Sequence, residues 1–218
     1  MEKAKFRCVI FDCEGTLVDS ERLCCMALVK VFNALGAQLT FQDVAQHFSG
    51  GKIADILSDT LELAGMSADL DLLESRYRQE LESIFMTQLK AMPGSEFLLQ
   101  QLDKYQIEYC VASNAPYEKM VSCLSRAGLA ERFDGKIFSA FEANSWKPEP
   151  DLIRYCAMNM GFSLDECVYV DDTAKGVKAG VSAGVATFQL QPLSSLNHFH
   201  HPNVQLISQL DELIEYLF

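Results

Sequence analysis

The stretch CVIFDCEGTLVD, residues 8–19, decides the fold of this chain. It begins as an apolar run, which is typical of a strand buried on both faces of a parallel sheet. Asp12 follows that run directly and so lies beyond the carboxyl end of the strand, where open parallel sheets bind their ligands. Glu14 faces the same side as Asp12 in an extended segment, and Gly15 permits a sharp turn. These residues predict a site at the end of the first strand.

Short apolar runs recur along the chain and are separated by helical patterns. After residues 6–11, the runs are 107–112, 136–139, 167–170 and 185–190. The helical patterns are 96–105, 117–127, 151–160, 173–183 and 206–217. Alternation of strand and helix predicts an α/β fold, a Rossmann-like doubly wound parallel sheet.

One region interrupts the alternation. Residues 20–90 read as wholly helical, with apolar faces over 21–35, 53–63 and 70–89. Ala91-Met92-Pro93-Gly94 then indicates a boundary. We therefore predict an α/β core domain of residues 1–18 and 91–218, with an inserted α-helical cap domain of residues 19–90. Asp19-Ser20 is expected to cap the first helix of that insertion.

Composition limits the partners and the location of the protein. The 218 residues are 49% hydrophobic and 22% charged, which is typical of a soluble globular protein with a sizeable core. The formal net charge of −12 disfavours nucleic acid and anionic membranes, because like charges repel. A small phosphorylated metabolite can still bind where a metal ion, a lysine or backbone N–H groups converge. We expect a monomer.

The cysteines and the N-terminus indicate a cytoplasmic protein. The eight cysteines include no CxxC pair and are expected to be reduced, buried thiols. No apolar run approaches the roughly 18 residues of a membrane-spanning helix. The N-terminal run is too short for a signal peptide, and no cleavage-like site follows it.

Polar residues also follow the later strands. Ser113-Asn114 ends the run 107–112, Asp171-Asp172 ends the run 167–170, and Lys147 precedes Pro148. Hard oxygen ligands such as paired carboxylates suit Mg²⁺. Each segment also has a plainer interpretation: turn formers for the first, a solvated turn for the second and a surface lysine for the third. Their order along the chain favours a common site.

Taken together, these segments resemble the four motifs of the haloacid dehalogenase-like (HAD) hydrolase superfamily. The first motif is DxDGT after a strand, the second a strand that ends in serine or threonine, the third a lysine, and the fourth a strand that ends in paired acids. The inserted helices resemble the cap found between the first two motifs. The similarity covers nearly the whole chain and points to the capped group of β-phosphoglucomutases, phosphoglycolate phosphatases and 6-phosphogluconate phosphatases. The run DCEGTLVDSE favours the last of these.

The resemblance implies a Mg²⁺-dependent phosphatase of small phosphorylated sugars or sugar acids that works through an aspartyl phosphate. Asp12 would be the nucleophile and Glu14 the general acid and base. Ser113 and Lys147 would hold the phosphoryl oxygens, with the backbone N–H of Asn114.

The resemblance also implies the metal ligands and a substrate-facing loop. Asp12, the backbone carbonyl of Glu14 and Asp172 would hold Mg²⁺, with Asp171 acting partly through water. In the cap, Gly51 and Lys52 resemble a loop that faces the substrate, although such a segment can equally be a turn between helices. Lys52 is expected to meet a second anionic group, such as the carboxylate of a sugar acid.

Glu14 departs from the family pattern, which has aspartate at this position. The longer side chain displaces the proton donor by roughly one bond length. General acid–base catalysis contributes typically about 10²–10⁴-fold, so a weakened enzyme is expected rather than an inactive one. Two alternatives stay open: a phosphosugar mutase of the β-phosphoglucomutase type, and a non-catalytic protein that binds a phosphorylated metabolite.

Overall fold

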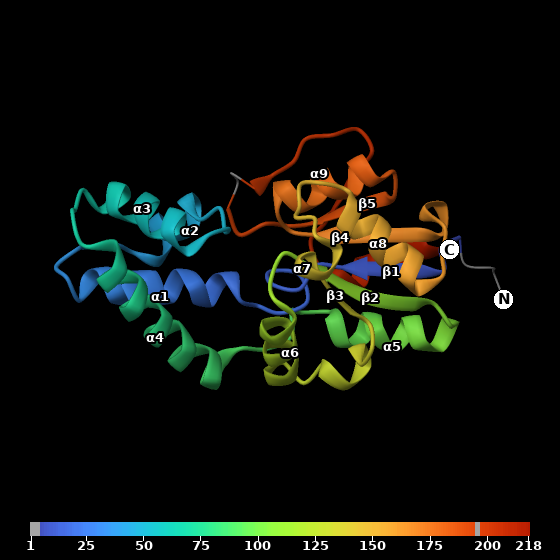
Figure 1. Cartoon of the computed structure of the whole chain (residues 1–218), viewed down its shortest axis with the longest axis horizontal. Helices are drawn as coiled ribbons and strands as arrows, with labels where there is room; N and C mark the ends of the chain where they lie inside the picture. The colour runs from blue at the N-terminus through green and yellow to red at the C-terminus, as the bar shows by residue number, and fades with distance from the viewer. Residues whose placement is uncertain (1–4, 195–196) are drawn as a thin grey trace. The chain divides into compact units, whose positions relative to one another are not determined.

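The computed structural model describes residues 5–194 and 197–218, which form two compact units. One unit is built on a parallel sheet and the other is helical (Figure 1). The sheet unit holds residues 5–18, 90–192 and 198–218, and the helical unit holds residues 19–89 with 193, 194 and 197. The predicted cap of 19–90 did not include these last residues. Ser194 joins the helical unit because its hydroxyl donates to the Gln46 carbonyl at 2.8 Å, a long-range contact with no local signal in the sequence.

The sheet has six parallel strands in the order β3-β2-β1-β4-β5-β6. The strands are β1 (Cys8–Phe11), β2 (Glu108–Ser113), β3 (Ile137–Ser139), β4 (Cys167–Asp171), β5 (Ala186–Leu190) and β6 (Val204–Ile207). The strand order reverses beside β1, so that the crevice beyond β1 and β4 is the expected ligand position of such a sheet. This arrangement confirms the predicted α/β fold.

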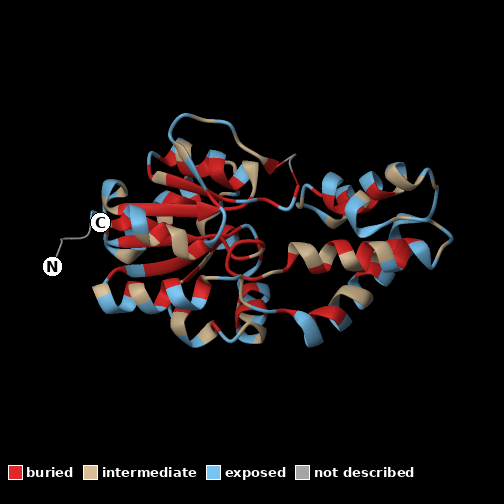
Figure 2. Ribbon diagram, turned by 180° about the vertical axis from the view of Figure 1, so that it is seen from behind, coloured by how far each residue is buried: buried red, intermediate tan, exposed pale blue. Residues whose placement is uncertain are grey.

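Helices cover both faces of the sheet (Figure 1). The helical elements of this unit are α5 (Ser95–Tyr105), α6 (Tyr117–Arg126), η1 (Ala130–Phe133), α7 (Ala140–Ala143), α8 (Asp151–Met160), η2 (Leu164–Glu166), α9 (Ala174–Ala183), η4 (Leu210–Leu213) and α10 (Ile214–Leu217). Helices α8 and α9 pack on the face that carries Cys8, Ile10 and Tyr169, whereas α5 and α6 lie on the other face. Figure 2 shows the central strands buried and the helices exposed on their outer sides, as the double-sided apolar runs predict.

The C-terminal segment differs from its prediction. A helix was expected over 206–217, but residues Val204–Ile207 form β6, which pairs with β5, and the helical turns begin only at Leu210. The spacing of the apolar residues on both sides of Ser208 is compatible with one continuous helix. It is equally compatible with a strand followed by a short helix. Pairing with the free edge of β5 decides between them.

The helical unit contains four helices in the described residues. They are α1 (Glu21–Asn33), α2 (Phe41–His47), α3 (Ile53–Ala64) and α4 (Leu70–Gln88). Helix α1 packs along α4 and also contacts α2 and α3. Thr40 caps α2 and Asp69 caps α4 through their side chains. The expected capping of α1 was wrong, because the Ser20 side chain makes no cap hydrogen bond and Asp19 instead accepts from Arg22 at 2.8 Å.

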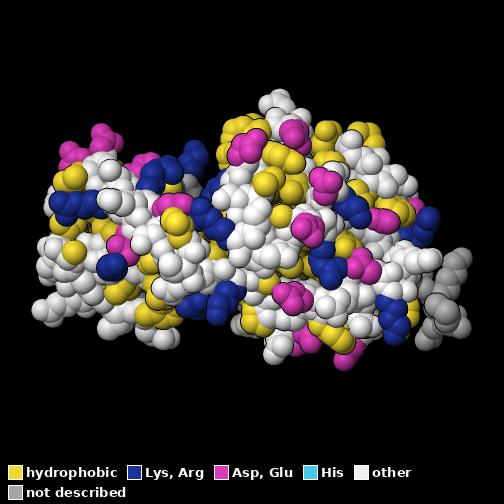
Figure 3. Space-filling model, turned by 90° about the horizontal axis from the view of Figure 1, so that it is seen from below, with side chains coloured by type: hydrophobic (Ala, Val, Ile, Leu, Met, Phe, Trp, Pro, Cys, Tyr) yellow, Lys and Arg dark blue, Asp and Glu magenta, His cyan; other side chains and the backbone are white. Residues whose placement is uncertain are grey.

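Three further observations concern the cysteines, membrane-spanning helices and surface charge. All eight cysteines are free thiols, and all but Cys24 are buried. No helix within residues 5–194 or 197–218 is long and apolar enough to cross a membrane. On the face seen in Figure 3, acidic side chains are interspersed with Lys and Arg, so the negative net charge is not gathered into one patch there.

Candidate active site

Strand pairing brings the predicted residues of the sheet unit to one edge. Phe11 of β1 lies opposite Val170 of β4 in the parallel register, so Asp12 and Asp171 follow at the same level. The Asp12 N–H donates to the Val170 carbonyl at 2.9 Å, which extends the pairing by one residue. On the other side of β1, Ser113 ends β2. Local strand formation and register therefore place the first, second and fourth motifs side by side.

Lys147 reaches this edge from the loop between α7 and α8. Its ammonium group is buried and donates to the Asp12 carboxylate, to Asp171 Oδ2 at 2.8 Å and to the Tyr169 hydroxyl at 3.1 Å. Asn114 fixes its backbone, because the Asn114 side chain accepts from the Lys147 N–H at 2.8 Å and donates to the Lys147 carbonyl at 3.1 Å. The surface-lysine interpretation is therefore wrong, and the Asn114 side chain is occupied in holding this loop.

Asp171 accepts hydrogen bonds on both of its carboxylate oxygens. Its Oδ2 accepts from Lys147 and from the Tyr169 hydroxyl, the latter at 2.5 Å. Its Oδ1 accepts from the backbone N–H and the hydroxyl of Thr173 at 2.8 and 2.7 Å. A direct bond from Asp171 to a metal ion would have to compete with these donors. The geometry therefore suits Asp171 to the orientation of Lys147, and the part of Asp171 in metal binding stays a prediction.

Asp172 faces the turn that follows Asp12. Its Oδ1 accepts from the Thr16 hydroxyl at 2.9 Å, and its backbone carbonyl accepts from the Gln189 side chain. Gly15 lies so close that a Cβ built on it would be 2.4 Å from Asp172 Oδ2. Its φ of 85° is also in the left-handed region, so glycine is required here both by space and by conformation.

The donor set at this edge fits Mg²⁺. Among the described residues, Asp12, Asp171 and Asp172 form the one cluster of potential metal-ligating side chains, and their oxygens lie within 4.8 Å of one another. All three carboxylates are buried, whereas Lys147 supplies a single positive charge among them. Carboxylate and carbonyl oxygens are the ligands that this hard cation prefers.

Burial affects the pKa values of Asp12 and Lys147. Desolvation raises the pKa of Asp12 to about 7, although the Lys147 charge opposes that rise. For Lys147, burial alone lowers the pKa, but the charges of Asp12 and Asp171 outweigh burial and raise the pKa above its ordinary value. Lys147 is therefore a permanent cation at neutral pH.

Glu14 and Ser113 lie at the rim of this cluster. The Glu14 carboxylate pairs with the Lys119 ammonium group of α6 at 2.8 Å. Ser113 is buried, and its hydroxyl oxygen accepts from the Ala115 N–H at 3.2 Å. The Ser113 O–H can therefore still donate to a bound ligand.

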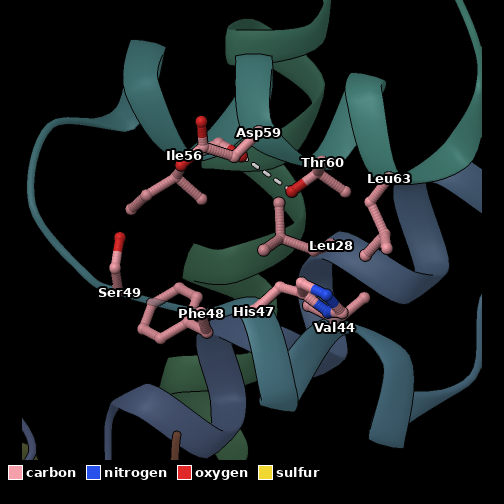
Figure 4. Close-up of a pocket in the computed structure, with 9 residues that line it drawn as sticks. All are labelled: Leu28, Val44, His47, Phe48, Ser49, Ile56, Asp59, Thr60 and Leu63. Carbon is pink, nitrogen blue, oxygen red and sulfur yellow. Dashed lines mark hydrogen bonds between the residues drawn. The ribbon is translucent and has the colours of Figure 1, made fainter. Parts of the chain in front are cut away.

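The two predicted residues of the cap lie in the helical unit. Gly51 and Lys52 are exposed and precede α3, and Gly51 has a φ of 102°. Their part in substrate binding stays a prediction. A small cavity of about 20 Å³ in the same unit has room for a water molecule but not for a sugar phosphate (Figure 4). The lining residues are Leu28, Val44, His47, Phe48, Ser49, Ile56, Asp59, Thr60 and Leu63.

Sequence reasoning missed four residues of the site: Tyr169, Thr16, Thr173 and Lys119. Tyr169 precedes Asp171 by two residues in a strand, so the alternation of side chains could have placed it on the same face. Thr173 is a recognisable N-cap of α9. Lys119 has no such signal, because its partner lies 105 residues away in the sequence.

Comparison with known proteins gives consistent matches. The family described as haloacid dehalogenase-like hydrolase matches residues 9–190. The chain is 31% identical over 212 residues to 6-phosphogluconate phosphatase of Escherichia coli, which covers 97% of this chain and 95% of that protein. It is 26% identical to phosphorylated carbohydrates phosphatase of Thermotoga maritima, over 81% of each chain. A solved haloacid dehalogenase-like protein of Agrobacterium tumefaciens superposes with a TM-score of 0.82 at 24% identity, over 97% of each chain.

Proposed function

Because the chain belongs to the haloacid dehalogenase-like hydrolase family and is a hydrolase of phosphate monoesters, we propose that it dephosphorylates small phosphorylated sugars or sugar acids, with 6-phosphogluconate favoured. The observation that carries this proposal is the buried contact between Asp12 and Lys147 beyond the end of β1. It sets a carboxylate nucleophile beside a fixed cation, which is the pair that phosphoryl transfer requires.

The reaction proceeds in two displacements. An Asp12 oxygen attacks phosphorus to form an acyl phosphate, while the sugar oxygen leaves and takes a proton from the Glu14 carboxyl group. A water molecule then attacks the same phosphorus, Glu14 takes a proton from that water, and inorganic phosphate leaves Asp12. Two easier steps thereby replace one that is extremely slow in water.

Positive charge is needed because a carboxylate and a phosphate dianion repel each other. Lys147 holds a fixed charge beside Asp12, and the Ser113 hydroxyl and the Asn114 N–H donate to the phosphoryl oxygens. A bound Mg²⁺ ion would neutralise further negative charge on the phosphate and the nucleophile. Asp12, Asp172 and the Glu14 carbonyl would hold it, with Asp171 assisting through water.

The substrate class rests on the relatives and on one cation of the helical unit. The names 6-phosphogluconate phosphatase and phosphorylated carbohydrates phosphatase support a sugar-based substrate. Lys52 is an exposed cation that can meet the carboxylate of a sugar acid. Lys52→Ala should therefore raise KM for 6-phosphogluconate more than for glucose 6-phosphate. An equal rise for both substrates would remove Lys52 from substrate recognition.

Phosphate release from a panel of sugar phosphates tests the proposal. The wild-type chain should release phosphate only when Mg²⁺ is present, and Asp12→Asn should release none. Glu14→Asp reports whether glutamate limits the rate. Product analysis separates the alternatives, because an isomerised phosphosugar indicates a mutase. Binding of 6-phosphogluconate without turnover by any variant would instead indicate a non-catalytic binding protein.

A further inference from the structure

Glu14 forms an ion pair with a residue that lies outside the four motifs. Both of its carboxylate oxygens lie 2.8 Å from the Lys119 ammonium nitrogen. Glu14 follows β1, whereas Lys119 lies in the first turn of α6, directly beyond the end of β2. Neighbouring strands of one sheet therefore set the distance between the two residues, and both belong to the sheet unit.

The length of the Glu14 side chain makes such a partner useful. Glutamate has one more rotatable bond than aspartate, so its carboxyl group samples more positions around the reacting centre. A misplacement of about 1 Å can cost on the order of 100-fold in rate. A contact from a rigid helix selects one of the glutamate rotamers and so limits this loss. An aspartate at position 14 is shorter by one methylene and has fewer rotamers, so its carboxyl group depends less on such a contact.

The exposure of the pair argues against a purely structural role. The Lys119 and Glu14 side chains are 51% and 27% exposed. An ion pair with this much solvent contact adds only about 0–1 kcal/mol to stability. The pair therefore has little effect on the free energy of folding, whereas Glu14 follows Asp12 by two residues, so the pair can affect the geometry of the reaction.

On the basis of the proposed function, we propose that Lys119 is a positioning residue that holds the Glu14 carboxyl group toward the ester oxygen and the attacking water. Lys119 and Glu14 act as one unit in this chain. Removal of Lys119 is harmful when residue 14 is glutamate and nearly neutral when it is aspartate. This dependence distinguishes positioning from a direct contact between Lys119 and the substrate phosphate, which would not depend on residue 14.

A double-mutant cycle on kcat tests this. The variants are Lys119→Met, Glu14→Asp and the double variant, and Lys119→Arg tests rescue by a cation of similar reach. Lys136→Met is the matched control, because Lys136 makes a half-exposed ion pair with Glu108 at 2.8 Å, at the opposite end of the strands. Thermal melting of every variant separates changes in rate from changes in stability.

Lys119→Met should lower kcat by about tenfold with little change in KM and melting temperature. In the Glu14→Asp background the same substitution should change kcat by no more than about twofold. Lys119→Arg should recover most of the activity, and Lys136→Met should resemble the wild type.

Three results would overturn the inference. These are an unchanged kcat in Lys119→Met, an equal loss in both backgrounds, or a loss expressed mainly in KM. If the wild-type chain releases no phosphate, the proposed function fails and this inference fails with it. If the wild type releases phosphate and Lys119→Met releases it at the same rate, the proposed function stands and only this inference fails.

Discussion

The hydroxyl group of Tyr169 joins the charged residues at the centre of the site. It accepts a hydrogen bond from Lys147 at 3.1 Å and donates one to Asp171 at 2.5 Å. Burial raises the pKa of Tyr169 well above its ordinary value, and the Asp171 charge adds to this rise, so the phenol keeps its proton. A neutral hydroxyl can thus orient both an ammonium group and a carboxylate without adding a charge.

Tyr169→Phe should therefore reduce both activity and stability. It leaves a buried carboxylate oxygen with one donor fewer, which costs about 1–3 kcal/mol, and we expect kcat to fall on the order of tenfold. Urea unfolding and phosphate release measure the two effects. Tyr109→Phe is the control, because the Tyr109 hydroxyl donates to Asp103 at 2.9 Å near the amino end of β2, whereas the site lies at the carboxyl ends of the strands. A loss of activity in Tyr109→Phe as large as that in Tyr169→Phe would contradict the assignment.

The raised pKa of Asp12 predicts how stability depends on pH without metal. Its value of about 7 in the folded chain exceeds the ordinary 3.8, so the folded state binds the proton more tightly. The stabilisation from this proton is complete below about pH 4 and disappears as the pH rises to about 7. Asp12→Asn removes the titration, so its stability relative to the wild type should increase from pH 5 to pH 8. Urea unfolding in EDTA at both pH values measures this, and a constant difference would refute the prediction.

At the scale of elements, the first turn of α9 packs against the site. A Cβ built on Gly176 would lie 1.8 Å from Asp171 Oδ2, and the Gly176 N–H donates to the Thr173 hydroxyl that itself donates to Asp171. Glycine is thus needed here for close approach, although it is a poor helix former.

Gly176→Ala should consequently destabilise the protein, although alanine favours helices by about 1 kcal/mol in an open position. We expect overpacking to lower the free energy of unfolding by about 1–3 kcal/mol or more. We also expect a lower kcat, because the added methyl group displaces Asp171 and, with it, Lys147. Lys178→Ala, an exposed change on the same helix, should alter neither. Chemical unfolding of the two variants gives the comparison, and a Gly176→Ala variant as stable as the wild type would show that α9 can shift without cost.

At the scale of the whole molecule, the acidic cluster should couple metal binding to folding. The three buried carboxylates lie close together, and Lys147 pairs with Asp12 and Asp171, so a divalent cation would relieve repulsion that only the folded chain experiences. Mg²⁺ at 100 times its dissociation constant should stabilise the protein by about 2.7 kcal/mol. Thermal melting with and without Mg²⁺ measures this effect.

Asp172→Asn should abolish most of this stabilisation, whereas Asp103→Asn, which removes an exposed carboxylate that pairs with Arg132, should retain it. The readout is independent of turnover. If Mg²⁺ raised the melting temperature of Asp172→Asn as much as that of the wild type, the ion would be bound elsewhere.

The sequence alone determined the class of fold and the residues at the strand ends. Double-sided apolar runs mark buried parallel strands, and Asp12, Ser113 and Asp171 follow them directly, so their place at one edge depends only on local pattern and on the rule that parallel strands end together. Long helical patterns likewise identified α1, α3 and α4, whereas the seven-residue α2 was not predicted.

Contacts between distant segments could be decided only by the tertiary structure. Three features each depend on a partner far away in the sequence. They are the ion pair of Glu14 with Lys119, the hydrogen bonds of Asn114 to the Lys147 backbone, and the formation of β6 in place of a helix. A local pattern states what a segment can form, but it does not state which neighbour will satisfy its hydrogen bonds and charges. That choice follows from the order of the strands and the packing of the helices on them.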